Sequence, residues 1–309
     1  MPPSNPVPRS PMPPRRPCFG LAALLVGLLG ALSATAHDTF LRLDDYTLTS
    51  GTTAEVVVFH GVFDQSYYRL ELTDATRLDL AGPSGRYEVA RDTWTLTTWG
   101  RRPWRYWQRA MAWLGRIDRR FTASFRITPR EPGPHAVGMV LPFAGAAMDP
   151  ATFETYLHEI GLDGEPIADH GLTDPDTIIR ERYRKSAKTL FLVDGATEPW
   201  SAVPLGHPAE FLPLANPHRL APGDTLPLRL LLHGRPLPDQ PVIVSRQKAA
   251  FTNAVPRRVR LRSDAEGRIE VTLDRPGVWW LSFTHLERLT DDPDFQYASE
   301  WATLVFELR

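Results

Sequence analysis

The last third of the chain consists of short apolar runs that turn residues separate at regular intervals. Proline and glycine, with 30 and 21 of the 309 residues, supply most of these interruptions, as at Pro222-Gly223-Asp224 and Arg275-Pro276-Gly277. The runs cover residues 209–214, 225–232, 240–246, 258–262, 268–273, 277–284 and 301–308. Short strands with regular turn signals predict a β-sandwich of immunoglobulin-like or transthyretin-like type.

The first part of the chain continues this pattern from residue 39 onward. We expect strands at residues 54–60, 70–80, 87–90, 93–99, 121–128 and 135–141. Two helices interrupt the strands. The segment 149–163 has an apolar stripe that ends at Gly161, and 173–188 has Pro175 in its first turn, before a strand at 189–193 that we assign to the first sandwich.

The predicted fold is therefore all-β, with two β-sandwich domains and a short helical segment between them. Residues 37–200 form the N-terminal sandwich with its helical insertions, and residues 201–309 form the immunoglobulin-like or transthyretin-like domain. Residues 1–36 precede both domains as a leader.

The leader has the three parts of a secretory signal peptide. Arg15 and Arg16 precede an apolar run over residues 19–32, which ends at the small residues Ala34-Thr35-Ala36. The run is shorter than the roughly 20 residues that a membrane span requires. We expect a periplasmic protein whose mature chain starts at His37; the alternative is an uncleaved anchor.

The charge and cysteine content restrict the chemistry of the mature chain. Without the leader, 32 Lys and Arg face 36 Asp and Glu, a net charge of −4, so no basic excess favours nucleic acid. The single cysteine, Cys18, is removed with the leader. A metal site must then use histidine, carboxylate, methionine or backbone ligands.

Four groups of segments together resemble one bacterial family. The segments are AHDTFLRLDDYTLTSG (36–51), FETYLHEIGLD (153–163) with RERYRKSAKTLFLVDG (180–195), PHRLAPGDTLPLRLLLHGRPLPDQPV (217–242), and SDAEGRIEVTLDRPGVWWLSFTHLERL (263–289) with SEWATLVFEL (299–308). The chain resembles the secreted nickel-uptake substrate-specific proteins, long carried as a domain of unknown function. The resemblance implies a periplasmic, mainly β protein with a role in the uptake or handling of a transition metal such as nickel, cobalt or copper. The second domain alone also resembles transthyretin-like modules, which implies fold and not function.

His37 is the sharpest candidate for a metal ligand. A free α-amine and the imidazole of the same residue can chelate one ion, because the amine's pKa of about 7.7–8 lets a metal displace its proton. One further imidazole would complete a three-nitrogen site suited to Cu(II) or Ni(II). The same use of an N-terminal histidine is found in lytic polysaccharide monooxygenases and some periplasmic copper carriers, and only this residue resembles them. The alternative is a histidine exposed by chance.

Three histidines at strand ends are candidates for the second imidazole. His60 ends the strand 54–60, His135 starts a strand after a Pro-Gly-Pro turn, and His285 closes a strand that starts at residue 277. For each of them, a structural role within the fold is the alternative. Glu154 and His158 share one helix face, which fits either a metal pair or a solvent-facing hydrogen bond.

The segment 101–120 departs from the family pattern. It places Trp104, Trp107, Met111 and Leu114 at helical spacing among arginines. Such a helix can lie on an anionic membrane; the alternative is a loop helix packed on the sandwich.

No motif of a hydrolase, a nucleotide-binding protein or a zinc protease is present. We therefore predict a binding protein, not an enzyme, which delivers or buffers a divalent transition metal for an envelope metal transporter. The alternatives are a copper-dependent oxidase built on His37 and a non-metal adhesion or scaffold module.

Overall fold

The computed structural model describes residues 37–63, 65–66, 70, 74–96, 122–162, 177–195, 204–247 and 257–309. Residues Ala34–Arg309 form one compact unit. Strands make up 55% of the described residues, which contain a single α-helix, so the predicted all-β class is confirmed. The leader and the segment 101–120 lie outside the described residues. Within the described ranges, no helix has both the length and the apolar character that crossing a membrane requires.

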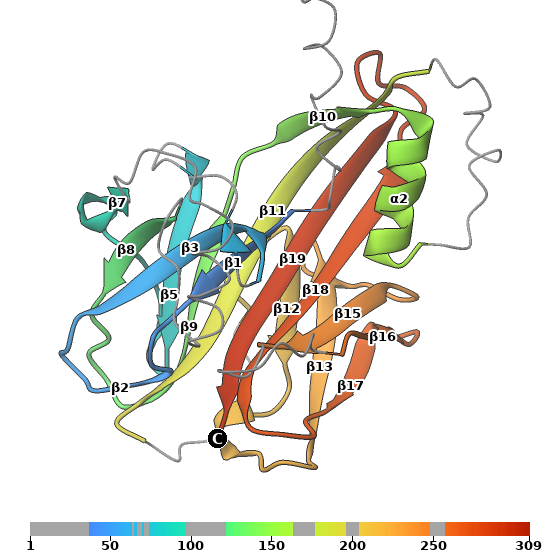
Figure 1. The fold of residues 1–309 in the computed structure, drawn as a ribbon. Coiled ribbons are helices and arrows are strands. Elements are labelled where there is room, and N and C mark those ends of the chain that lie inside the picture. Colours follow the sequence, from blue (N-terminus) through green and yellow to red (C-terminus); the bar gives the residue numbers. More distant parts are fainter. Residues whose placement is uncertain are drawn as a thin grey trace, which may run out of the picture. The chain divides into compact units, whose positions relative to one another are not determined.

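The largest sheet joins strands from both ends of the chain (Figure 1). Its order is β16 (Val259–Arg262), β15 (Pro241–Arg246), β18 (Gly277–Arg288), β19 (Tyr297–Leu308), β11 (Ile179–Val193), β9 (Gly133–Val140), β5 (Arg77–Gly82) and β6 (Gly85–Glu88), and β10 (Ala144–Met148) and β2 (Thr47–Leu48) also pair with β11. Strands β11 and β19 run parallel to each other. The sheet thus contains strands from both sides of residue 200, and the division into two domains at that residue stays a prediction.

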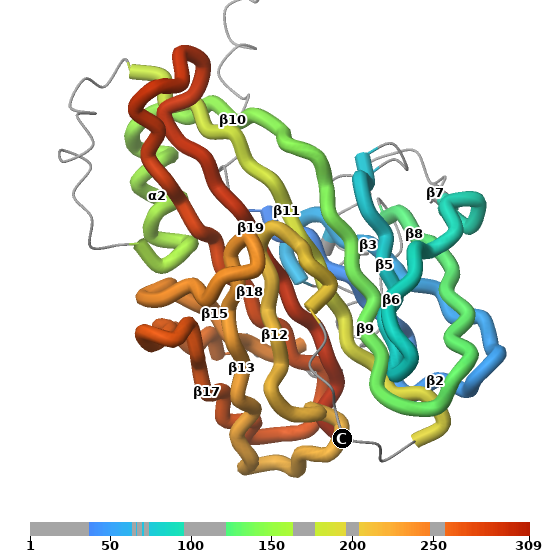
Figure 2. Tube along the Cα trace, turned by 180° about the vertical axis from the view of Figure 1, so that it is seen from behind, coloured from blue at the N-terminus to red at the C-terminus, as the bar shows by residue number. Residues whose placement is uncertain are grey.

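Two smaller sheets complete the architecture. One contains β1 (Asp38–Arg42), β3 (Ala54–Val62), β8 (Ala123–Ile127) and β7 (Thr95–Leu96), with β4 (Gln65–Ser66) paired to β3; the other contains β12 (Ala209–Pro213), β13 (Thr225–Leu232) and β14 (Arg235–Pro236), with β17 (Arg268–Thr272) paired to β13. Figure 2 shows β12 and β13 on the side of the large sheet that faces the viewer. Each small sheet shares a hydrophobic core with the large one. Leu226, Leu228 and Leu230 of β13 are fully buried at alternate positions, as the period of a strand requires.

The predicted helix at 149–163 is confirmed as α2 (Pro150–Ile160). The carboxylate of Asp149 accepts a hydrogen bond from the Thr152 N–H (2.8 Å), which satisfies one of the unpaired donors of the first turn. Gly161 ends the helix with φ of 88°, a value that glycine adopts without a steric cost. The apolar stripe packs on Tyr297 and Trp301 of β19. Two short 3₁₀ turns, η2 (Arg91–Thr93) and η4 (Pro217–Arg219), are the other helical elements of the described ranges.

The predicted helix at 173–188 is wrong wherever it is described, because residues 179–188 belong to the 15-residue strand β11. Ile179 and Glu181 are buried on either side of the exposed Arg180, which is the period of a strand. Nine residues of β11 pair with β19, and such long-range pairing outweighs the helix propensity of Arg, Glu and Lys.

Most other predicted strands are confirmed with boundaries shifted by a few residues. The strand predicted at 70–80 starts only at Arg77, and that at 93–99 is reduced to Thr95–Leu96 in the described part. Strand β18 continues to Arg288, beyond the predicted end near His285.

Candidate functional site

Strand β1 brings two of the four predicted histidines together. It pairs with β3 in a register that places Thr39 opposite His60, and the Thr39 Oγ1 lies 2.9 Å from Nδ1 of His60. His37 directly precedes β1, two residues before Thr39, so the alternation of the strand extended by one residue gives it the face of Thr39. Diagonal neighbours of this kind lie about 7–8 Å apart, within reach of two imidazole side chains.

Side chains of the large sheet hold β1 in place through its carbonyl groups. Thr303 of β19 donates its hydroxyl proton to the Thr39 carbonyl (2.5 Å), and Thr189 of β11 donates to the Leu41 carbonyl. The Lys185 ammonium of β11 donates to the carbonyl of His37. Residues about 150 and about 260 positions away in the sequence therefore hold β1, and Lys185 holds the carbonyl of His37.

Burial and a nearby cation keep both histidines neutral. Burial, together with the charges of Lys185 and His37, lowers the pKa of His60 to about 2. Burial and the charge of Lys185 also lower the pKa of His37. Neutral imidazole is the form that binds a metal ion.

Lys185 is the centre of a buried group of charges. Its ammonium lies 5.0 Å from the ring of Tyr183 and 4.8 Å from that of Trp301. Burial lowers its pKa to about 8, although the carboxylates of Asp38 and Glu181 counteract the shift. Burial likewise raises the pKa of Asp38 to about 6.

Glu181, two strand positions from Tyr183, is tied into the same region by hydrogen bonds. Its Oε1 accepts a hydrogen bond from the Tyr156 hydroxyl of α2 (2.9 Å) and one from the Ser299 hydroxyl. The indole N–H of Trp301 donates to Ser299 Oγ (2.8 Å). Burial raises the pKa of Glu181. A cavity of about 120 Å³ lies next to this group and has Asp38 and Trp301 in its wall.

The other two predicted histidines lie elsewhere. His285 pairs with Glu300, which pairs with Arg184, the neighbour of Lys185 in β11. Adjacent strand residues point to opposite faces, so His285 lies on the face of the sheet away from Lys185. Its Nδ1 is 3.2 Å from Oε1 of Gln240.

His135 is buried and stacks on Phe191, with ring centroids 5.4 Å apart. Phe191 lies six residues along β11 from Lys185, roughly 20 Å at the rise of a strand. The Nδ1 of His135 is 3.0 Å from the carbonyl of Gly133. The structure therefore brings only His60 of the three candidates to His37.

Glu154 and His158 both lie on the exposed face of α2. Among the described residues, no group of three His, Cys, Asp or Glu side chains has the arrangement of a metal site.

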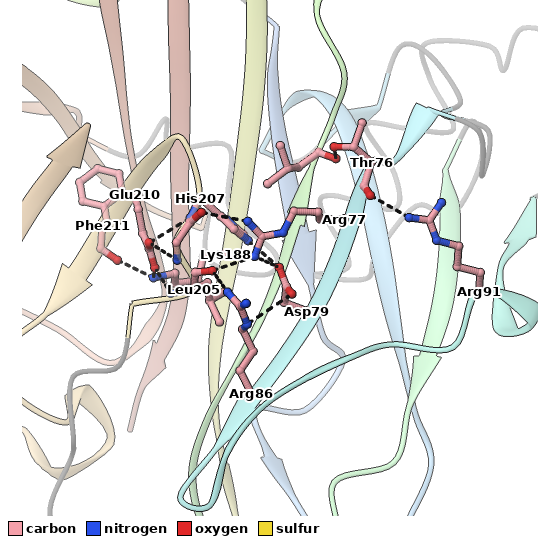
Figure 3. Close-up of polar contacts among 12 residues, drawn as sticks. Thr76, Arg77, Asp79, Arg86, Arg91, Lys188, Leu205, His207, Glu210 and Phe211 are labelled. Carbon is pink, nitrogen blue, oxygen red and sulfur yellow. Dashed lines mark hydrogen bonds and ion pairs between the residues drawn. The ribbon is translucent and has the colours of Figure 1, made fainter. Parts of the chain in front are cut away.

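A second cluster of buried charges lies on the opposite face of β11 (Figure 3). The Lys188 ammonium donates to Oε1 of Glu210 and, at 2.8 Å, to the Phe211 carbonyl. The Glu210 carboxylate also accepts the backbone N–H groups of Leu205 (2.6 Å), Gly206 (2.9 Å) and His207 (3.2 Å).

The cluster continues through Asp79. Its Oδ2 lies 3.2 Å from Nε2 of His207 and 3.0 Å from the Arg77 guanidinium, and its Oδ1 lies 3.7 Å from Nε of Arg86 (Figure 3). Each charge here contacts a group of opposite charge, which indicates a structural role.

Sequence reasoning missed Asp38, Glu181 and Lys185. Asp38 follows His37 directly, and the alternation of a strand would have placed it on the opposite face, toward a core. Glu181 and Lys185 were assigned to the predicted helix at 173–188, where a strand partner was not expected.

The fold and these residues define a class of all-β protein in which an N-terminal strand is fixed across the large sheet, beside buried charges and a cavity. The chain belongs to the family described as Domain of unknown function (DUF4198), whose model matches residues 34–287. This match confirms the predicted membership of an uncharacterised family, and the link to nickel uptake stays a prediction. No curated protein matches the chain.

Three solved structures are similar to the chain at about 10% sequence identity. Alpha-2-macroglobulin of Escherichia coli, activated by porcine elastase, has 10% sequence identity and a TM-score of 0.20, over 88% of this chain and 20% of its own. Salmonella alpha-2-macroglobulin reacted with methylamine has 10% sequence identity and a TM-score of 0.19, over 88% of this chain and 15% of its own. A DUF4785 family protein of Legionella pneumophila has 9% sequence identity and a TM-score of 0.21, over 78% of this chain and 50% of its own. The chain thus spans half or less of the length of each of these proteins.

Proposed function

We propose that the mature protein is a periplasmic binding protein for a divalent transition metal (nickel, cobalt or copper), which it delivers to or buffers for an envelope uptake system. The ligands are the α-amine and imidazole of His37 and the imidazole of His60. The observation that supports the proposal is the pairing of Thr39 with His60 in β1 and β3, because His37 lies two residues before Thr39.

The donor set fits such an ion. Three nitrogen donors suit Cu(II) and Ni(II) better than they suit calcium or magnesium, which prefer oxygen. Thr39 engages Nδ1 of His60, so the metal would bind Nε2, and the hydrogen bond would orient the ring as outer partners of metal-binding histidines commonly do. The charge of Lys185 opposes a cation at this place, and the carboxylates of Asp38 and Glu181 offset it.

The N-terminal amine can be tested separately from the side chains. Calorimetry with Ni(II), Co(II) and Cu(II) should compare mature protein that starts at His37 with a version that carries one extra N-terminal alanine. The extension keeps the imidazole and removes the free amine from the chelate. We expect the affinity to fall at least tenfold, which corresponds to about 1.4 kcal/mol.

The second imidazole requires its own variant. His60→Ala should also weaken binding at least tenfold, whereas the exposed His158→Ala on α2 serves as the matched control and should leave the affinity unchanged. Equal affinity of the His37-initiated, alanine-extended and His60→Ala proteins would disprove the proposed ligand set. Titrations in which none of the three metals produces a heat of binding would disprove the proposed metal-binding function.

A further inference from the structure

The cavity beside β1 has both acidic and basic residues in its wall. Asp38 of β1, Ser282 of β18 and the half-buried Glu159 of α2 lie in its wall, together with the exposed Arg258 that precedes β16. The charges of Lys185 and Arg258 both act on Asp38, and the Asp38 carboxylate is hydrogen-bonded to Ser282. One small space therefore has a carboxylate and a guanidinium among its walls.

Aromatic rings form a continuous wall of the same cavity. Phe40, Phe63 and Trp280 contact one another. The ring centroids lie 5.2 Å apart for Phe40 and Phe63, 5.5 Å for Phe40 and Trp280, and 5.8 Å for Phe63 and Trp280. The Arg258 guanidinium lies 5.7 Å from the ring of Trp280. The faces of such rings attract cations, most strongly where water is excluded.

We propose that this cavity binds a small zwitterionic amino acid, with its ammonium group toward Asp38 and the aromatic rings and its carboxylate toward Arg258. Arginine is the side chain best suited to a carboxylate, because its fork donates two parallel hydrogen bonds. A simple amine would be attracted by the Asp38 carboxylate but repelled by the Arg258 guanidinium. The zwitterion matches both charges.

The volume limits the size of the ligand. A cavity of about 150 Å³ holds one benzene molecule, so about 120 Å³ accommodates a compound of roughly the size of glycine or alanine. A larger side chain would exceed this volume. The site needs no metal ion, so it can be tested in metal-free protein, separately from the ligand set proposed at His37.

The test is an NMR titration of ¹⁵N-labelled mature protein, kept metal-free with EDTA, in which the indole signals of Trp280 and Trp301 report on the cavity. Glycine should shift these signals along a saturable curve. Methylammonium and acetate, which each carry only one of the two charges, should bind at least tenfold more weakly. The absence of a saturable shift with glycine, or equal affinity for methylammonium, would overturn the proposal.

Two variants assign the charges. Asp38→Asn should abolish glycine binding, and Arg258→Gln should weaken it at least tenfold. Arg262→Gln is the matched control, because Arg262 is exposed on neighbouring β16 and pairs with Asp239 instead of lining the cavity. Since Arg258 is exposed, its variant is expected to fold even if Asp38→Asn does not. Undiminished glycine binding by Arg258→Gln would disprove the zwitterion assignment.

Discussion

Lys185 and Lys188 lie three residues apart on β11, both buried, and their surroundings differ sharply. Lys188 faces β12 and contacts the Glu210 carboxylate and the Phe211 carbonyl directly (Figure 3). Lys185 faces β1, donates to the His37 carbonyl and lies near the rings of Tyr183 and Trp301. The carboxylates of Asp38 and Glu181 act on it electrostatically. Among the residues that the structure describes, Lys188 has a direct ion pair and Lys185 has none.

The carboxylates of the two regions show what this difference means. Burial alone would raise the pKa of Glu210, but Lys188, His207 and the backbone donors outweigh it and lower the pKa, so the pair remains charged. Around Lys185, burial prevails and raises the pKa values of Asp38 and Glu181. Removing one partner of a directly paired buried charge is costly, whereas groups with perturbed pKa values beside a cavity are typical of sites that bind ligands.

The same substitution at the two lysines gives the largest expected contrast. Lys188→Met should lower the free energy of unfolding by about 3–5 kcal/mol, because it leaves the buried Glu210 carboxylate without its cation. Lys185→Met should cost less than about 1 kcal/mol, since Asp38 and Glu181 can take up a proton instead of remaining as unpaired charges. Urea denaturation at pH 7 measures both values.

The double variant Lys188→Met/Glu210→Gln provides the control for this contrast. Removing both charges should recover part of the stability that Lys188→Met loses, because an uncompensated charge is no longer buried. Equal losses for the two single methionine variants would contradict the distinction between the two regions.

The helix over the Lys185 region allows a second, smaller test. Gly161 has φ of 88°, and a Cβ atom there would lie 2.9 Å from Cβ of Pro241 in β15. Gly161→Ala should therefore cost about 2 kcal/mol, from the left-handed backbone strain and the clash together. Gly234→Ala, at φ of 78° with open space around the new methyl group, should cost only the strain, about 1 kcal/mol.

Hydrogen exchange shows where Gly161→Ala acts. Amides of α2 should exchange faster in this variant, while those of β12, which borders the Lys188 cluster, should keep their wild-type rates. Faster exchange in β12 would indicate that the two regions unfold as one unit, and the comparison between them would then lose its energetic basis.

Local signals made α2 and the C-terminal strands predictable. Asp149, Pro150 and Gly161 mark the ends of the helix within the helix's own sequence, and β13 has the predicted bounds of 225 and 232. These elements agree with their local propensities, so no distant partner was needed to assign them.

Strand β11 and the candidate site depended on contacts that local sequence does not show. The Arg, Glu and Lys residues at 180–188 have helical propensity and the composition of a solvent face, yet Glu181, Lys185 and Lys188 are buried against β1, β12 and β19. His60 could be proposed as one of three partners for His37, but only the pairing of β1 with β3 distinguishes it from the other two. Register depends on the whole sheet, not on either strand alone.

The smallest expected effect concerns His207, the one histidine of the Lys188 cluster. Burial, aided by the charge of Lys188, lowers its pKa below 6.5 despite the Asp79 and Glu210 carboxylates. The unfolded chain then binds more protons than the folded one as the pH falls below 6.5, so the folded state is destabilised by acid. Between pH 7 and 5.5 the wild-type protein should lose more stability than His207→Gln, measured by urea denaturation at each pH. If His207→Gln instead follows the wild-type curve, the folded protein binds a proton at His207 as readily as the unfolded chain does. The cluster around Lys188 would then carry an additional positive charge, and its contrast with the region of Lys185 would be smaller.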